Sequence, residues 1–147
     1  MSEVRHRTVG ALRVDLIDAA CDLGTEAIGE AGIGDVLICG EAATLRSARL
    51  LLRAAPRLLV LNDAGVGKDG AGVAGLARLA DVGLAAVAIT HDSARIGDPD
   101  DMLENGRVAH LNRPARALGL TEGPLLEQLA SRAITGGEPA TESGVTR

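Results

Sequence analysis

Runs of aliphatic residues alternate along the chain with segments whose apolar positions recur at helical spacing. The continuous runs predict strands, because strands buried between helices read as uninterrupted aliphatic stretches. They cover residues 35–39, 58–61, 84–89 and 107–111. The periodic segments predict helices. They cover residues 45–55, 71–82 and 122–134. Strands and helices that alternate in this way indicate an α/β fold.

The stretch 58–92 organises this pattern. It contains an apolar run, a glycine-rich loop, a helical segment of small residues and a second apolar run. Strand, helix and strand in this order predict a βαβ unit with two parallel strands. We therefore expect a three-layer, mainly parallel sheet of about four to six strands with helices on both faces. A Rossmann-like or flavodoxin-like arrangement fits this description.

The two ends of the chain carry weaker patterns. Val9–Val14 favours an edge strand, and short helical fragments are expected at 19–23 and 26–31. Residues 136–147 are mostly small and polar, which predicts a flexible tail. The chain is interpreted as a single α/β domain over residues 1–135 followed by this tail.

Composition narrows the classes of partner. The chain has no Phe, Tyr or Trp, which argues against base stacking and aromatic cages. Its formal charge of −5 makes a nucleic-acid partner unexpected. The sequence has no signal-peptide pattern and no apolar run of about eighteen residues, so we expect a cytoplasmic protein without membrane contact. Cys21 and Cys39 show neither metal-site spacing nor a disulfide framework.

The glycine-rich loop resembles the dinucleotide-binding fingerprint of Rossmann proteins. Gly65, Gly67 and Gly70 match the pattern GxGxxG. Asp92 ends the following strand, where the fingerprint places its ribose-binding acid. The resemblance implies a nucleotide or dinucleotide cofactor, although Asp69 adds a negative charge to the phosphate cradle. A glycine-rich connection that only packs a helix on the sheet is the alternative.

Polar residues follow several of the predicted strands. Because the carboxyl ends of parallel strands meet at one edge of a sheet, we expect these side chains to share a pocket. The candidate catalytic residues are Glu41, Asp63 and His91. The candidate ligand-binding residues are Asn62, Gly65, Gly67, Lys68, Gly70, Asp92, Ser93 and Arg95.

These residue types predict acid/base chemistry on an anion. The ordinary pKa of histidine lies near neutrality, so His91 is the natural proton donor or acceptor, oriented by Asp63 or Asp92. Lys68, Arg95 and the amides of the glycine loop are expected to hold a carboxylate or phosphate.

Each candidate also has a structural alternative. His91 can simply cap a strand end, and Arg95 can pair with Asp98. Cys39 is a conceivable nucleophile but also a typical core residue. His110 lies inside the last predicted strand, where a structural role is expected. The acidic run 98–101 predicts the capped start of a short helix rather than a metal site, so no metal is expected.

The leading hypothesis is a small protein that binds an anionic metabolite at the carboxyl edge of its sheet. An isomerase, lyase or hydrolase that uses acid/base chemistry fits this hypothesis, and no cofactor is required. One alternative is a nucleotide- or dinucleotide-binding module that acts through the loop 65–75. Another is a non-catalytic subunit of a homo-oligomer. Whether the chain is an enzyme stays open at this level.

Overall fold

The computed structural model describes residues 4–20, 34–54 and 56–131. Several sequence-based expectations lie outside these ranges. They are most of the helical fragment at 19–23, the whole fragment at 26–31, Cys21 and the tail at 136–147.

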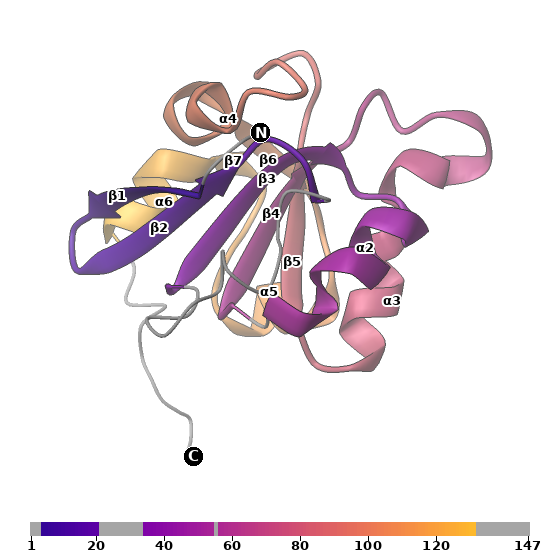
Figure 1. Ribbon diagram of the computed structural model, residues 1–147, viewed down its shortest axis with the longest axis horizontal. Helices are drawn as coiled ribbons and strands as arrows, with labels where there is room; N and C mark the ends of the chain where they lie inside the picture. Colours follow the sequence, from indigo (N-terminus) through magenta and orange to yellow (C-terminus); the bar gives the residue numbers. More distant parts are fainter. Residues whose placement is uncertain (1–3, 21–33, 55, 132–147) are drawn as a thin grey trace.

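A single sheet of seven strands forms the centre of the described part of the chain. The strands are β1 (Arg5–Val9), β2 (Leu12–Ile17), β3 (Val36–Ala42), β4 (Leu58–Asn62), β5 (Ala85–Ile89), β6 (Arg107–Leu111) and β7 (Gly123–Pro124). Their order in the sheet is the same as their order in the chain. Figure 1 shows β1 to β5 side by side in this order. Strands β2 to β5 are parallel, whereas β1, β6 and β7 each run antiparallel to their inner neighbour.

The predicted mainly parallel, three-layer sheet of four to six strands is therefore wrong. Three of the six strand pairings are antiparallel, and the consecutive strand order is neither Rossmann-like nor flavodoxin-like. The edge strand expected at Val9–Val14 is also wrong, because the chain turns in the middle of that segment. Gly10 has φ +59° in this turn, a conformation that glycine adopts without steric cost. The hairpin between β1 and β2 is the result.

The described helices are short. They are α2 (Leu45–Leu51), α3 (Gly75–Asp81), α4 (Pro99–Asn105), α5 (Arg113–Ala117) and α6 (Leu125–Ser131), with 3₁₀ turns η2 (Leu52–Ala54) and η3 (Lys68–Val73). Helices α2 and α3 pack together on one side of the sheet, and α4 contacts α6 (Figure 1). None of them is long and apolar enough to cross a membrane.

Helix α4 begins as its sequence predicts. The Asp98 side chain accepts a hydrogen bond from the Asp101 amide, and Pro99 occupies the first turn. Pro99 needs no hydrogen-bond acceptor at this position because it has no amide hydrogen. The acidic run is therefore a helix cap.

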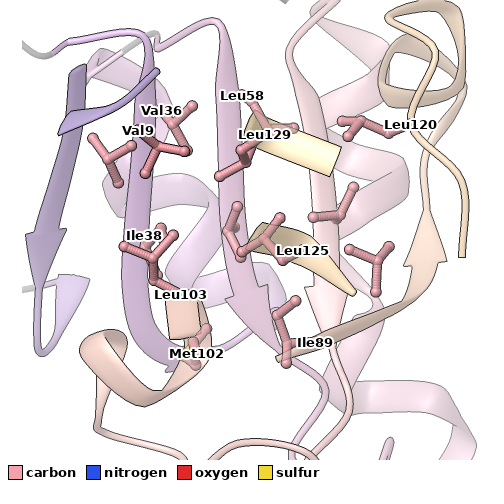
Figure 2. Packing of buried hydrophobic residues seen from close by; sticks show 14 of the residues in the cluster. Val9, Val36, Ile38, Leu58, Ile89, Met102, Leu103, Leu120, Leu125 and Leu129 are labelled. Carbon is pink, nitrogen blue, oxygen red and sulfur yellow. The ribbon is translucent and has the colours of Figure 1, made fainter. Parts of the chain in front are cut away.

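Aliphatic side chains fill two separate core layers. The first joins alternate residues of β2 to β6 to helices α4 and α6. Figure 2 shows this layer, with Ile38 and Leu58 of the sheet near Met102, Leu125 and Leu129. The second layer joins the other residues of β3 to β5 to helices α2 and α3. Every residue of β4 and β5 is buried, which explains why both strands are aliphatic apart from Asn62 at the end of β4.

Candidate functional site

The carboxylate of Asp63 lies just beyond the end of β4, and only 5% of its side chain is exposed. One of its oxygens, Oδ1, accepts hydrogen bonds from the amides of Gly65 (2.8 Å) and His91 (3.0 Å). The Asp63 amide donates to the carbonyl oxygen of Ile89 at the end of β5 (2.8 Å). These bonds hold the carboxylate between the ends of two neighbouring parallel strands.

Two histidines contact this carboxylate from different strands. His91 follows β5, and its Nδ1 lies 3.3 Å from Oδ1 of Asp63. His110 belongs to β6, and its Nε2 lies 3.2 Å from Oδ2. The side chains of His91 and His110 are 53% and 32% exposed, so both reach solvent. We call Asp63, His91 and His110 the Asp63 cluster.

The topology explains why the cluster forms here. The connection that leaves β4 leads to α3 on one face of the sheet, whereas the connection that leaves β5 leads to α4, which packs in the other core layer. Adjacent connections that diverge in this way leave a crevice between them. Because β6 runs antiparallel to β5, His110 is placed opposite Ala88 near the same edge.

The environment favours the ionised form of Asp63. Burial alone would raise the pKa of its carboxyl. The hydrogen bonds from the amides of Gly65 and His91, and from the side chains of His110 and His91, outweigh burial and lower the pKa below its ordinary value of 3.8. An ionised carboxylate only accepts hydrogen bonds. The histidine nitrogens that face Asp63 therefore carry protons.

The remaining ring nitrogens of the two histidines have different surroundings. Nε2 of His91 lies 3.0 Å from a carboxylate oxygen of Asp92, whose side chain is 85% exposed. Among the described residues, no carboxylate pairs with Nδ1 of His110. The cluster thus presents two unlike proton-exchanging groups that share one buried carboxylate.

The loop that follows Asp63 has a left-handed backbone conformation and lies beside the cluster. Four consecutive residues, from Ala64 to Gly67, have positive φ values between 51° and 77°. Val66 (φ 70°) is a strained member, because a β-branched side chain disfavours this region. Hydrogen bonds from the Val66 amide to the carbonyl of Asp63 (2.6 Å) and from the Gly72 amide to the carbonyl of Val66 (2.5 Å) hold the loop closed. This backbone conformation places the Gly65 amide within hydrogen-bond distance of the Asp63 carboxylate.

Several amides of the glycine loop and of the start of α3 form hydrogen bonds with carbonyl groups of the protein. The amide of Gly70 donates to the carbonyl of Gly67, and the first amide of α3, that of Gly75, donates to the carbonyl of Ala43. A Cβ on Gly75 would collide with the carbonyl of Thr44, so this glycine allows α3 to approach the start of α2. These amides add no support to the nucleotide-binding alternative, which stays a prediction.

The side chains of two predicted ligand-binding residues form hydrogen bonds that link separate backbone segments. Asn62 is fully buried, and its side chain donates to the carbonyl of Ala94 (3.2 Å) and accepts from the amide of Ala64 (2.8 Å). The hydroxyl of Ser93 donates to the carbonyl of Thr90 (3.0 Å) and accepts from the amide of Arg107 (2.9 Å). Both side chains position the loops that carry Asp63 and His91.

Other predicted site residues lie apart from the cluster. The carboxylate of Glu41 accepts from the amide of Ala20 (2.9 Å) and from the hydroxyl of Ser47 (2.7 Å), beside a separate hollow of about 460 Å³. Arg95 is 79% exposed, and its guanidinium is 3.9 Å from Asp98. Lys68 is exposed on η3. None of these side chains forms a hydrogen bond or ion pair with the Asp63 cluster.

His110 is the site residue that the sequence interpretation missed. It was expected to be structural, yet it contacts Asp63 and lines an open groove of about 520 Å³. The signal available in the sequence was a histidine inside an otherwise mainly apolar strand. That signal does not indicate which edge of the sheet the histidine approaches. The apolar pattern of β6 is compatible with either strand direction, and the direction decides the edge.

Covalent and metal chemistry find no support in the described part of the chain. Cys39 is fully buried, as the core interpretation predicts. No group of three or more His, Cys, Asp or Glu residues is arranged to hold a metal ion among the residues that the structure describes.

The fold and this geometry define a mixed α/β protein in which a buried carboxylate holds two solvent-accessible histidines. Comparisons of the chain with protein-family models, curated proteins and solved structures give no match.

Proposed function

We propose that the Asp63 cluster transfers protons to and from a small anionic metabolite by general acid/base catalysis. One observation carries the proposal: a single buried carboxylate accepts hydrogen bonds from His91 and His110, which come from different strands and both reach solvent. A carboxylate that holds a histidine in one tautomer and orientation is the arrangement that acid/base catalysis uses.

The two histidines take complementary roles in this proposal. Nδ1 of His110, which has no carboxylate partner in the part of the chain that the structure describes, accepts a proton from the substrate. His91, whose ring lies between the carboxylates of Asp63 and Asp92, acts as the acid in this step and donates a proton from Nε2 to a second substrate atom. His110 is then protonated and His91 neutral, and exchange with water restores both, since both rings are exposed.

The surroundings favour proton transfer over covalent catalysis. The hydroxyl of Ser93 is committed to Thr90 and Arg107, and Cys39 is buried in the core. Among the described residues, the hydrogen-bond partners of the Ser93 hydroxyl include no histidine of the cluster, whereas a nucleophile needs a neighbouring base for activation. An isomerase or lyase reaction, or hydrolysis by an activated water, fits two histidines that act without a nucleophile.

The experiment begins with a panel of dicarboxylates, sugar phosphates and nucleotides. Binding is detected as a rise in melting temperature by circular dichroism, because the chain has no Trp or Tyr for intrinsic fluorescence. Each stabilising compound is then incubated with the protein in D₂O, and ¹H NMR follows deuterium incorporation or product formation.

We expect the His110→Gln and His91→Gln variants each to slow the reaction by about 10²- to 10⁴-fold. His6→Gln is the matched control, because His6 also pairs with a buried carboxylate, that of Asp15, but lies outside the cluster. Undiminished turnover in both cluster variants would overturn the proposal. Stabilisation by nucleotides alone, without proton exchange, would favour the nucleotide-binding alternative instead.

A further inference from the structure

We infer that the groove beside His110 binds the body of the substrate, and that Arg113 and Arg116 bind its anionic group. This inference rests on the proposed function and specifies its substrate class. The substrate is a molecule with a carboxylate or phosphate at one end, an apolar middle and an exchangeable proton at the other end.

The groove lies over β6, between α3 and α5. Helices α2 and α3 cover the neighbouring strands on this face, in the second core layer, and they leave β6 open. Its volume of about 520 Å³ suits a small metabolite. His110 lines it together with Arg113 and Arg116, so the proposed base and two cations share one groove.

Asn112 makes the walls of this groove rigid. The side chain is buried, and its amide nitrogen donates to the carbonyls of Leu76 (3.0 Å) and Leu84 (2.9 Å). Its oxygen accepts from the amides of Ala86 (3.0 Å) and Ala115 (3.1 Å). One side chain thus ties β5, α3 and α5 together, and such a prearranged site loses less conformational freedom on binding.

The two arginines suit an anion. Arg113 and Arg116 are three residues apart on α5, which places them on the same side of the helix. Both are exposed, and neither forms an ion pair among the described residues. A guanidinium donates in a planar fork that matches carboxylate and phosphate oxygens. Asp81, the carboxylate on the α3 side of the groove, disfavours a second anion there.

The α3 wall of the groove is apolar. Leu76, Ala77 and Ala80 present aliphatic side chains, and the small alanines leave room for a ligand chain. The anion contacts expected from the sequence, Lys68 and Arg95, do not line this groove. An apolar wall opposite paired arginines favours an amphiphilic anion over a compact, fully polar one.

The test uses hexanoate, which combines a carboxylate with an apolar chain, and two-dimensional ¹H–¹⁵N NMR of the full-length protein. Hexanoate is expected to shift the amide signals of residues 111–116 and 76–80. Inorganic phosphate is expected to affect only residues 113–116. Hexylammonium, which has the same chain and the opposite charge, is expected to leave the signals of residues 113–116 unchanged.

The variant Arg113→Gln/Arg116→Gln is expected to bind hexanoate at least about tenfold more weakly. Arg46→Gln/Arg49→Gln, which removes two exposed arginines from α2, is the matched control and is expected to bind like the wild type. Melting curves by circular dichroism check that both variants fold. Unchanged affinity in the α5 variant, or shifts confined to other surfaces, would overturn the inference.

A third variant separates this inference from the proposed function. Asp63 does not line the groove, so Asp63→Asn is expected to bind hexanoate normally while it loses proton transfer. Weak binding by the α5 variant together with full turnover in Asp63→Asn supports the groove and overturns the acid/base role. Normal binding by the α5 variant together with lost turnover in Asp63→Asn overturns the groove alone.

Discussion

Two buried carboxylates in this protein each contact a histidine, yet their surroundings differ. Asp63 lies between the ends of β4 and β5, whereas Asp15 lies within β2 beside the β1–β2 hairpin. Asp15 is fully buried and accepts hydrogen bonds from the amide of Gly34 (2.6 Å) and from Nε of Arg13 (3.2 Å), and Nδ1 of His6 lies 2.6 Å from its Oδ1. We call Asp15, His6 and Arg13 the Asp15 cluster.

The two carboxylates differ in the groups that form hydrogen bonds with them. Asp15 has a permanent cation beside it, because the guanidinium of Arg13 stays protonated at all ordinary pH values. Within residues 4–20, 34–54 and 56–131, the hydrogen-bond partners of the Asp63 carboxylate are backbone amides and two titratable rings, and one of those rings lines a groove. The pairing of a buried aspartate with a histidine is therefore common to both clusters and does not distinguish them. Partners that exchange protons next to a ligand-sized groove make the Asp63 cluster a candidate.

The largest expected difference between the two clusters is in the free energy of unfolding when Asp15 or Asp63 is replaced by the isosteric asparagine. We expect Asp15→Asn to lower the free energy of unfolding by about 3 kcal/mol, because a charged partner and several hydrogen bonds lose their acceptor. We expect Asp63→Asn to lower it by about 1–2 kcal/mol, since only amides and neutral or half-exposed rings are affected. Urea unfolding followed by far-ultraviolet circular dichroism measures both values. An equal or larger loss in Asp63→Asn would mean that Asp63 is mainly structural.

The pH dependence of stability sharpens the comparison at Asp63. Its folded-state pKa is lowered, so the ionised carboxylate stabilises the fold above the ordinary pKa of 3.8, and this contribution disappears as the pH falls through the folded-state value. The stability difference between wild type and Asp63→Asn is expected to shrink below about pH 4.

The same pH series in His91→Gln/His110→Gln provides the control. Two of the hydrogen bonds that lower the pKa of Asp63 are removed in this variant, so the acid-dependent loss is expected to be smaller. A stability difference that grows on acidification would contradict the assigned direction of the pKa shift.

The smallest expected effect comes from two glycines in left-handed turns. Gly65 (φ 77°) and Gly10 (φ 59°) both have room for a methyl group, so alanine at either position strains only the backbone. Each substitution is expected to cost about 1 kcal/mol. Gly65→Ala is also expected to change the His91 ring signals in NMR, because that ring lies against Gly65, whereas Gly10→Ala leaves them unchanged. Unaltered His91 signals in Gly65→Ala would show that the loop does not position this ring.

Much of the local structure was predictable from the sequence. Strand β6 was predicted with the bounds it has, and β4 and β5 differ from their predicted bounds by one residue each. The helix expected at 71–82 begins as a 3₁₀ turn, η3, before α3. The sequence also placed Asp63 and His91 at the same sheet edge, because both follow parallel strands joined by one crossover, but it left open whether Asp63 or Asp92 contacts the ring.

Other parts of the candidate site were beyond prediction. Glu41 was grouped with Asp63 and His91 because it ends a neighbouring strand, but its carboxylate turns to Ala20 and Ser47. Arg95 was expected to clamp an anion, and its exposed guanidinium lies near Asp98 instead. The position of a residue at a sheet edge is a property of the strand, whereas the direction of its side chain depends on partners far away in the chain.

The sequence by itself determined that β4 and β5 are buried strands, where α4 is capped and which loop leads from β4 towards α3, because burial, capping and turn formation act on neighbouring residues. Only the tertiary structure decided that β6 runs antiparallel and brings His110 to Asp63. A run of five residues with the same burial pattern satisfies the core in either direction. In the folded chain, β6 pairs antiparallel with both β5 and β7, and these pairings fix its direction.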